Sequence, residues 1–161
     1  MQAQFSEFVK LLGDCPDEQK VRLLALFDSL INNQQDFIRF LINECDYDED
    51  EDDCIAELEF GITYDIRDGI YQLLCYFLDG YNDDWKISYN YLEKYITLCI
   101  GKEFVINDYD YHKARQQLES QSEFTLFQIF NIDENVGIWV VKKSDRPTLL
   151  ELAKSLGLEV Y

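Results

Sequence analysis

The run from Asp46 to Asp53 limits how this chain can fold more than any other feature. Seven of its eight residues are Asp or Glu, and only Tyr47 interrupts them. Carboxylates this close together repel one another, and burying them together would carry a large desolvation cost. We therefore expect a solvated acidic loop over residues 45–54, between a helical part (1–44) and an α/β part (55–161) of a single domain spanning 1–161.

The negative charge is concentrated around this loop. Residues 44–84 contain fifteen Asp or Glu and one basic residue, Arg67, which is a net charge of −14. Residues 1–43 and 85–161 carry −2 each, which completes the total of −18. Such a field attracts cationic partners and repels nucleic acid and anionic lipid. The charge therefore favours a basic protein as partner and disfavours nucleic acid or a membrane.

The composition indicates a folded protein of the cytoplasm. The chain is 47% hydrophobic and 15% aromatic, which argues against disorder. Its first residues lack the basic and apolar segments of a secretion signal, and the longest apolar stretch, 69–78, is too short to cross a bilayer. Five cysteines without CxxC spacing are expected to be reduced. A disulfide between Cys45 and Cys54, which flank the acidic loop, is the alternative.

The first part of the chain has the apolar spacing of three short helices. Apolar side chains recur every three or four residues, as on the buried face of an α-helix. Gly13 ends the first helix, and Pro16 followed by Asp17 and Glu18 suits the first turn of the second. We expect helices over residues 5–12, 16–33 and 35–44.

The second part mixes strand and helix patterns. Polar and apolar residues alternate over 57–64, as in a half-buried strand, and Asp65 is placed to cap a helix over 66–77. Residues 79–84 form a turn before a helix over 85–99 that Gly101 ends. The rest predicts a strand at 104–106, a helix at 109–120, a hairpin of 123–132 and 136–142, a helix at 144–156 and a strand at 158–161.

This order of elements predicts an α+β fold. The N-terminal helices would be followed by a two-layer α/β sandwich, with helices on one face of a mixed, mostly antiparallel sheet.

No segment carries a catalytic signature. The chain lacks the GxSxG, P-loop, GxGxxG and HExxH motifs. His112 is the only histidine, and the sequence places no nucleophile beside it, so a surface histidine is preferred to a general base. We expect no enzymatic activity, no cofactor and no metal.

The acidic loop matches a calcium site only in part. Asp46, Asp48 and Asp50 stand at positions one, three and five of an EF-hand pattern, with Glu57 at position twelve. However, Glu51 occupies the sixth position, where the sharp turn needs glycine. A solvated charge run explains the pattern better, and a divalent-metal-responsive module over 46–57 is kept as an alternative.

Aromatic residues accompany the acids. Such rings supply contact area and cation–π attraction for a Lys/Arg-rich partner, while carboxylates steer its approach. The candidate partner-binding residues are Asp46, Tyr47, Asp48, Glu49, Asp50, Glu51, Asp52, Asp53, Tyr64, Asp65, Asp68, Asp83, Asp84 and Trp85. The alternative is that Tyr64 and Trp85 belong to the core and the acids only keep the protein soluble.

Two stretches carry a resemblance. Residues 60–65 leading into 66–78, and 137–143 leading into 149–158, resemble a family of uncharacterised bacterial proteins, over about residues 55–161. That family implies no catalytic residues. In charge and size the chain is also similar to immunity proteins of bacterial polymorphic-toxin systems. These small, acidic α+β proteins of the cytosol bind a basic toxin domain and block its active site.

The hypothesis that follows is a non-enzymatic, acidic protein-binding module, most concretely an immunity-type inhibitor of a basic toxin. A nucleic-acid mimic and an uncharacterised structural or interaction protein are the alternatives from related classes.

Overall fold

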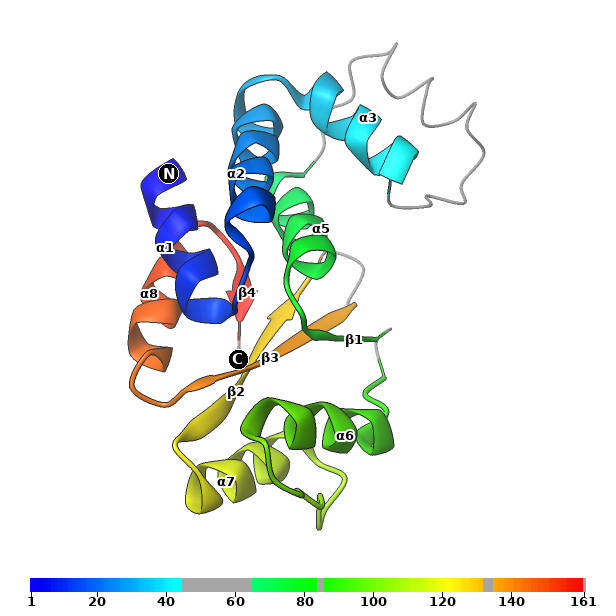
Figure 1. The fold of residues 1–161 in the computed structure, drawn as a ribbon, viewed down its shortest axis with the longest axis vertical. Coiled ribbons are helices and arrows are strands. Elements are labelled where there is room, and N and C mark those ends of the chain that lie inside the picture. The colour runs from blue at the N-terminus through cyan, green and yellow to red at the C-terminus, as the bar shows by residue number, and fades with distance from the viewer. Residues whose placement is uncertain (45–64, 84–85, 132–134, 161) are drawn as a thin grey trace.

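The computed structural model describes residues 1–44, 65–83, 86–131 and 135–160 (Figure 1). The helices within these ranges are α1 (Gln2–Leu12), α2 (Asp17–Asn32), α3 (Gln34–Glu44), α5 (Ile66–Phe77), α6 (Tyr89–Ile100), α7 (Tyr111–Gln121) and α8 (Arg146–Ser155). The strands are β1 (Tyr81–Asp83), β2 (Phe124–Phe130), β3 (Val136–Lys142) and β4 (Glu159–Val160).

The four strands form one sheet in the order β1-β3-β2-β4, and every pairing among them is antiparallel. The hairpin of β2 and β3 is its centre, with Phe127 opposite Trp139. Short β1 and β4 pair along its two edges. The α+β class, the N-terminal helices and the hairpin are as the sequence predicts.

Helices cover both faces of this sheet, which corrects the expectation that they lie on one face. Phe127 and Trp139 point into a first core, which α1, α2, α3, α5 and α8 complete. Leu126 and Ile138 point the opposite way into a second core, which α6 and α7 complete. Figure 1 shows α6 and α7 below the sheet and the other helices above it. The physical reason lies in β2 and β3, whose residues are apolar on both faces, as in strands buried on both sides.

Aromatic contacts join the N-terminal helices to this framework. The rings of Phe5 and Phe27 stack with centroids 4.0 Å apart, and Phe8 meets the strand residue Phe127 edge to face at 6.0 Å. Both phenylalanines of α1 are fully buried. The amphipathic pattern of the first helices therefore comes from packing on the first core.

Three local predictions need correction, and a fourth falls outside the described residues. Residues 104–106 form no strand, and side chains of α6 and α7 bond their backbone instead. Residues 81–83, expected in a turn, form β1 on the edge of β3. The helix expected from residue 85 begins at Tyr89. The strand expected at 57–64 lies outside the described residues.

Among the described helices, none has both the length and the apolar character needed to cross a bilayer.

Candidate protein-binding surface

Most of the residues proposed for partner binding lie outside the described ranges. These are Asp46 to Asp53, Tyr64, Asp84 and Trp85. Three of the candidates are described: Asp65, Asp68 and Asp83. Each has a position in the fold that can be compared with the predicted role.

Asp65 caps α5, as its place in the sequence suggests. Its carboxylate accepts the backbone N–H of Arg67 at 2.8 Å and the guanidinium Nη2 of the same residue at 2.7 Å. The side-chain hydrogen bond from Arg67 lowers the pKa of Asp65 to about 2. Asp65 therefore stays ionised under ordinary conditions, and its charge is already paired with a cation.

Asp68 is buried, with only 5% of the residue exposed, so it does not lie on a partner-binding surface. This corrects its place among the predicted contacts. It stands in the first turn of α5, where the helix dipole favours a carboxylate. The buried Tyr71 follows one turn later, and Asp68 contributes to raising the pKa of that hydroxyl, although burial is the main cause. The spacing of apolar residues in α5 places Asp68 on its inner face.

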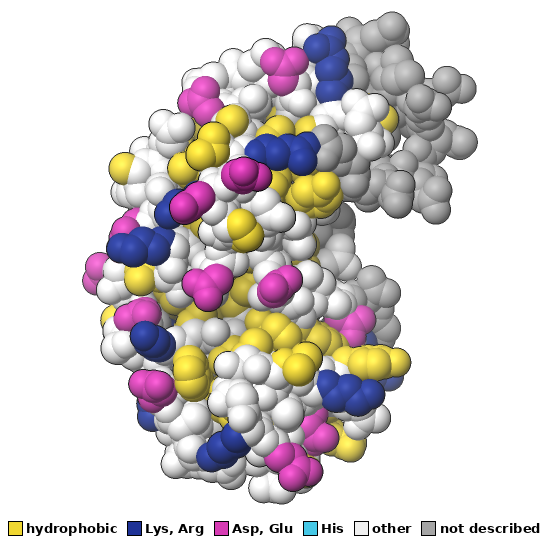
Figure 2. Space-filling view, in the orientation of Figure 1, with side chains coloured by type: hydrophobic (Ala, Val, Ile, Leu, Met, Phe, Trp, Pro, Cys, Tyr) yellow, Lys and Arg dark blue, Asp and Glu magenta, His cyan; other side chains and the backbone are white. Residues whose placement is uncertain are grey.

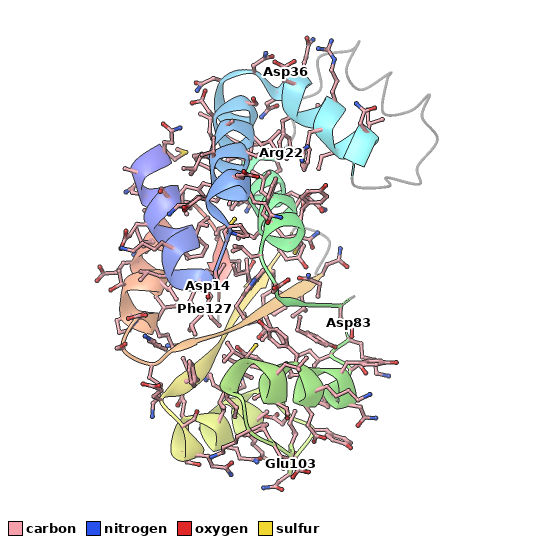
Figure 3. The ribbon with its side chains drawn as sticks, viewed as in Figure 1. Asp14, Arg22, Asp36, Asp83, Glu103 and Phe127 are labelled. Atoms are coloured by element: carbon pink, nitrogen blue, oxygen red, sulfur yellow. The ribbon has the colours of Figure 1, made fainter. Side chains whose placement is uncertain are left out.

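Asp83 closes the turn that leads into α6. Its carboxylate accepts hydrogen bonds from the Tyr81 hydroxyl and, at 3.1 Å, from the backbone N–H of Ser88. The same N–H lies 2.7 Å from the Tyr81 hydroxyl oxygen. Burial, followed by the bond to Asp83, raises the pKa of Tyr81 well above its usual range. Asp83, labelled in Figure 3, thus has a structural role in joining β1 to α6.

A different surface emerges from the exposed apolar residues. Of the eight large hydrophobic residues that are exposed in the described part, four lie between positions 91 and 109: Tyr91, Leu98, Val105 and Tyr109. Leu98 is the most exposed, at 80%. Figure 2 shows hydrophobic side chains over the lower half of the molecule, where α6 lies, with both basic and acidic side chains among them. This clustering distinguishes the region from the scattered apolar residues found on most surfaces.

Part of this region is hollowed into a shallow groove of about 440 Å³, here called the α6 groove. Glu93, Lys94, Thr97 and Leu98 of α6 form one wall, and the following segment forms the other with Glu103, Phe104 and Val105. Phe104 and Ile106 point into the second core, while Val105 between them is 53% exposed. Burial therefore alternates along residues 104–106 and leaves one apolar side chain, Val105, turned outward.

Hydrogen bonds hold the two walls together. Thr97 Oγ1 accepts the backbone N–H of Phe104 at 3.0 Å, and Glu93 Oε2 accepts that of Ile106 at 2.7 Å. From the other side, Gln117 of α7 donates to the carbonyl of Val105 at 2.7 Å. These side chains replace the strand partner that residues 104–106 lack, so the wall is positioned by the fold.

Two aromatic contacts involve residues of α6. Lys94 Nζ lies 5.4 Å from the ring centroid of Tyr91, three residues before it on the same helix face. At the start of α6, Tyr89 stacks on Tyr109 with centroids 5.3 Å apart. Tyr91, Lys94 and Leu98 follow one another at helical spacing on one face of α6, and with the groove they form a candidate contact surface of mixed apolar and polar character.

Sequence reasoning missed this surface, although a signal was present. The segment 89–100 carries Tyr, Leu, Ile and Cys all around the helix, which is more than one buried face needs. Leu92 and Ile96 are fully buried, and Tyr91 and Leu98 are the surplus. An excess of apolar residues on a short surface helix is a usable indication of a contact site.

The histidine and the potential metal ligands of the described ranges are the remaining candidates for chemistry. His112 is exposed and packs its ring against Tyr111. No group of three His, Cys, Asp or Glu in the described ranges is arranged to hold a metal ion. Compared with protein-family models, curated proteins and solved structures, the chain matched none of them.

Proposed function

We propose that this chain is a non-enzymatic binding protein for a basic protein partner, most concretely an immunity-type inhibitor of a basic toxin. The observation that carries the proposal is the charge distribution, with −14 of the total −18 lying within residues 44–84. A cationic surface is the natural complement of such a field. The exposed apolar residues of α6 give the same protein a place to make short-range contacts.

The two features would contribute differently to binding. Exposed carboxylates accelerate encounter with a cationic protein but add little affinity once screened by salt. Buried apolar and aromatic contacts supply most of the affinity in protein interfaces. Inhibition would then be steric: the acidic segment would take the place of the phosphates that a nuclease-like partner holds, and the protein would cover its active site.

The test is a pull-down from cells that encode the chain, at low salt, with bound proteins released by a salt step and identified by mass spectrometry. A parallel bait with Asp48, Asp50 and Asp52 changed to Asn is the control for charge. The proposal is supported if the natural chain retains one dominant basic protein and the control bait retains less of it. That protein should also be toxic when it is produced alone. A broad set of DNA-binding proteins would indicate a nucleic-acid mimic instead, and retention of no basic protein would overturn both.

A further inference from the structure

We infer that the α6 groove binds a cationic amphipathic segment of a partner protein, seating an apolar side chain between Leu98 and Val105 beside the carboxylate of Glu103. This inference rests on the proposed function, because it assigns the short-range contact of the same partner. Its three supports are the apolar walls, the charges around them and the rigidity of the groove.

Exposure of the apolar walls of the groove to water is unfavourable in free energy. Leu98 and Val105 are 80% and 53% exposed, and both line the groove. Covering both would remove apolar area that the fold itself leaves uncovered, at about 25 cal/mol per Å². Phe104 behind them is fully buried in the second core, so the floor of the groove is packed against the rest of the protein.

The charges around the walls select a basic occupant. Glu103 is exposed, and within the described residues it makes no hydrogen bond or ion pair. Figure 3 shows Glu103 at the lower edge of the molecule. Glu93, a second lining carboxylate, accepts the Ile106 N–H through Oε2. The lining cation, Lys94, is drawn toward the ring of Tyr91.

The groove exists before any partner arrives. The hydrogen bonds from Thr97, Glu93 and Gln117 fix residues 104–106 against two helices, so little ordering entropy would be lost on binding. Preformed grooves of this kind accept amphipathic segments through one or two apolar anchors. The net charge of −18 disfavours two other occupants, a second copy of this chain and an anionic membrane.

The experiment uses a fluorescent synthetic peptide with one face of Leu and flanking Lys, and measures its affinity for the full chain by anisotropy. Two matched peptides replace either Leu by Ser or Lys by Glu. We expect the double variant Leu98→Ser/Val105→Ser to bind the Leu/Lys peptide about tenfold more weakly. Glu103→Gln should weaken binding about threefold and reduce its dependence on salt. Both apolar substitutions are at exposed positions, so stability should be kept.

Val21→Ser is the matched control, because Val21 is 71% exposed on α2, in a different part of the molecule. Unchanged affinity in Val21→Ser, with loss in Leu98→Ser/Val105→Ser, supports the groove. Equal affinity of the natural chain and the groove variant would overturn the inference.

Other outcomes separate the inference from the proposed function. If affinity falls only when Asp48, Asp50 and Asp52 are neutralised, the groove is wrong and the acidic binding protein stands. If no Leu/Lys peptide binds and the pull-down retains no basic protein, both fail. A concentration-dependent dimer in sedimentation that Leu98→Ser abolishes would make a second copy the occupant and would also overturn the inference.

Discussion

The indole of Trp139 lies against the backbone of Gly80, so close that a β-carbon at Gly80 would stand 2.6 Å from the indole nitrogen. Trp139 is fully buried at the centre of the hairpin, and Gly80 precedes the edge strand β1. This contact lets β1 pair with β3 while the largest buried side chain fills the space beside it.

Gly80→Ala should therefore destabilise the protein by about 1–3 kcal/mol, because the rigid indole or the backbone of β1 must move to admit the methyl group. Urea unfolding followed by tryptophan fluorescence measures the loss. Gly13→Ala is the control, since the nearest atoms to its new β-carbon lie 4.0 Å away. That variant should be neutral or slightly stabilised. Equal stability of the two variants would contradict the close packing of Trp139 on Gly80.

The pair of Asp65 and Arg67 predicts a pH dependence. The pKa of Asp65 is lowered to about 2, whereas an unfolded Asp titrates near ~3.9. A lowered pKa stabilises the fold above the unfolded value, and the stabilisation is lost as the pH falls toward about 2. Asp65→Asn should remove this pH dependence of the free energy of unfolding and lower that free energy by roughly 1 kcal/mol at neutral pH. The value is reduced for solvent screening, because the Asp65 side chain is 33% exposed.

Urea unfolding at several pH values between about 2 and 5 measures the stabilisation by Asp65 and its loss in acid. Asp14→Asn, at an exposed carboxylate after α1, controls for the loss of one negative charge. If the two variants had the same stability profile, Asp65 would not be the paired cap described here.

Thiol reactivity should differ sharply between two cysteines. Burial raises the pKa of Cys75 to about 12, and its Sγ donates to Asn82 Oδ1 at 3.0 Å. At about pH 8 only about one Cys75 in ten thousand would be a thiolate. Cys99 is exposed on α6, so it should react with a disulfide reagent much faster. Mass spectrometry after digestion gives each rate, and the two should become similar in concentrated guanidinium. Equal rates in the native protein would mean that Cys75 is accessible.

The proposed function predicts a kinetic effect of the acidic run. With the partner found by pull-down, changing Asp48, Asp50 and Asp52 to Asn should slow association at low salt by about tenfold and change dissociation less. Surface plasmon resonance at two ionic strengths separates the rates. Asp14→Asn, Asp28→Asn and Glu151→Gln together make the same charge change at exposed positions elsewhere. Unchanged kinetics in the acidic-run variant would place the interface on another surface.

Helices were the most predictable part of this fold. The apolar period of α1 and the caps at Asp65 and Gly101 are local, so their signals survive in any tertiary context. The hairpin was predictable for the same reason. The arrangement of helices around the sheet was not predictable, because both faces of β2 and β3 are apolar. Only the tertiary structure shows which helices cover each face.

The candidate site was less predictable. The charge of the sequence predicts the sign of a partner's charge. It does not tell which carboxylates are buried within the fold, as Asp68 is. The exposure of Leu98 and Val105 likewise depends on where α6 and residues 103–106 meet. A site made of apolar residues that the core leaves exposed can be found only in a structure, whereas a run of charged residues can be found in the sequence.

The packing of α1 against α8 ties two segments that are synthesised far apart in time. Phe5 and Phe8 leave the ribosome about 140 residues before Leu149 and Ala153, the α8 residues that share their core. At typical translation rates of about 5–20 residues per second, this interval lasts roughly 7–30 seconds. During this interval Phe27 can already stack on Phe5, but the part of the α1 face that packs on α8 stays uncovered. Repulsion between chains of net charge −18 would then oppose their aggregation.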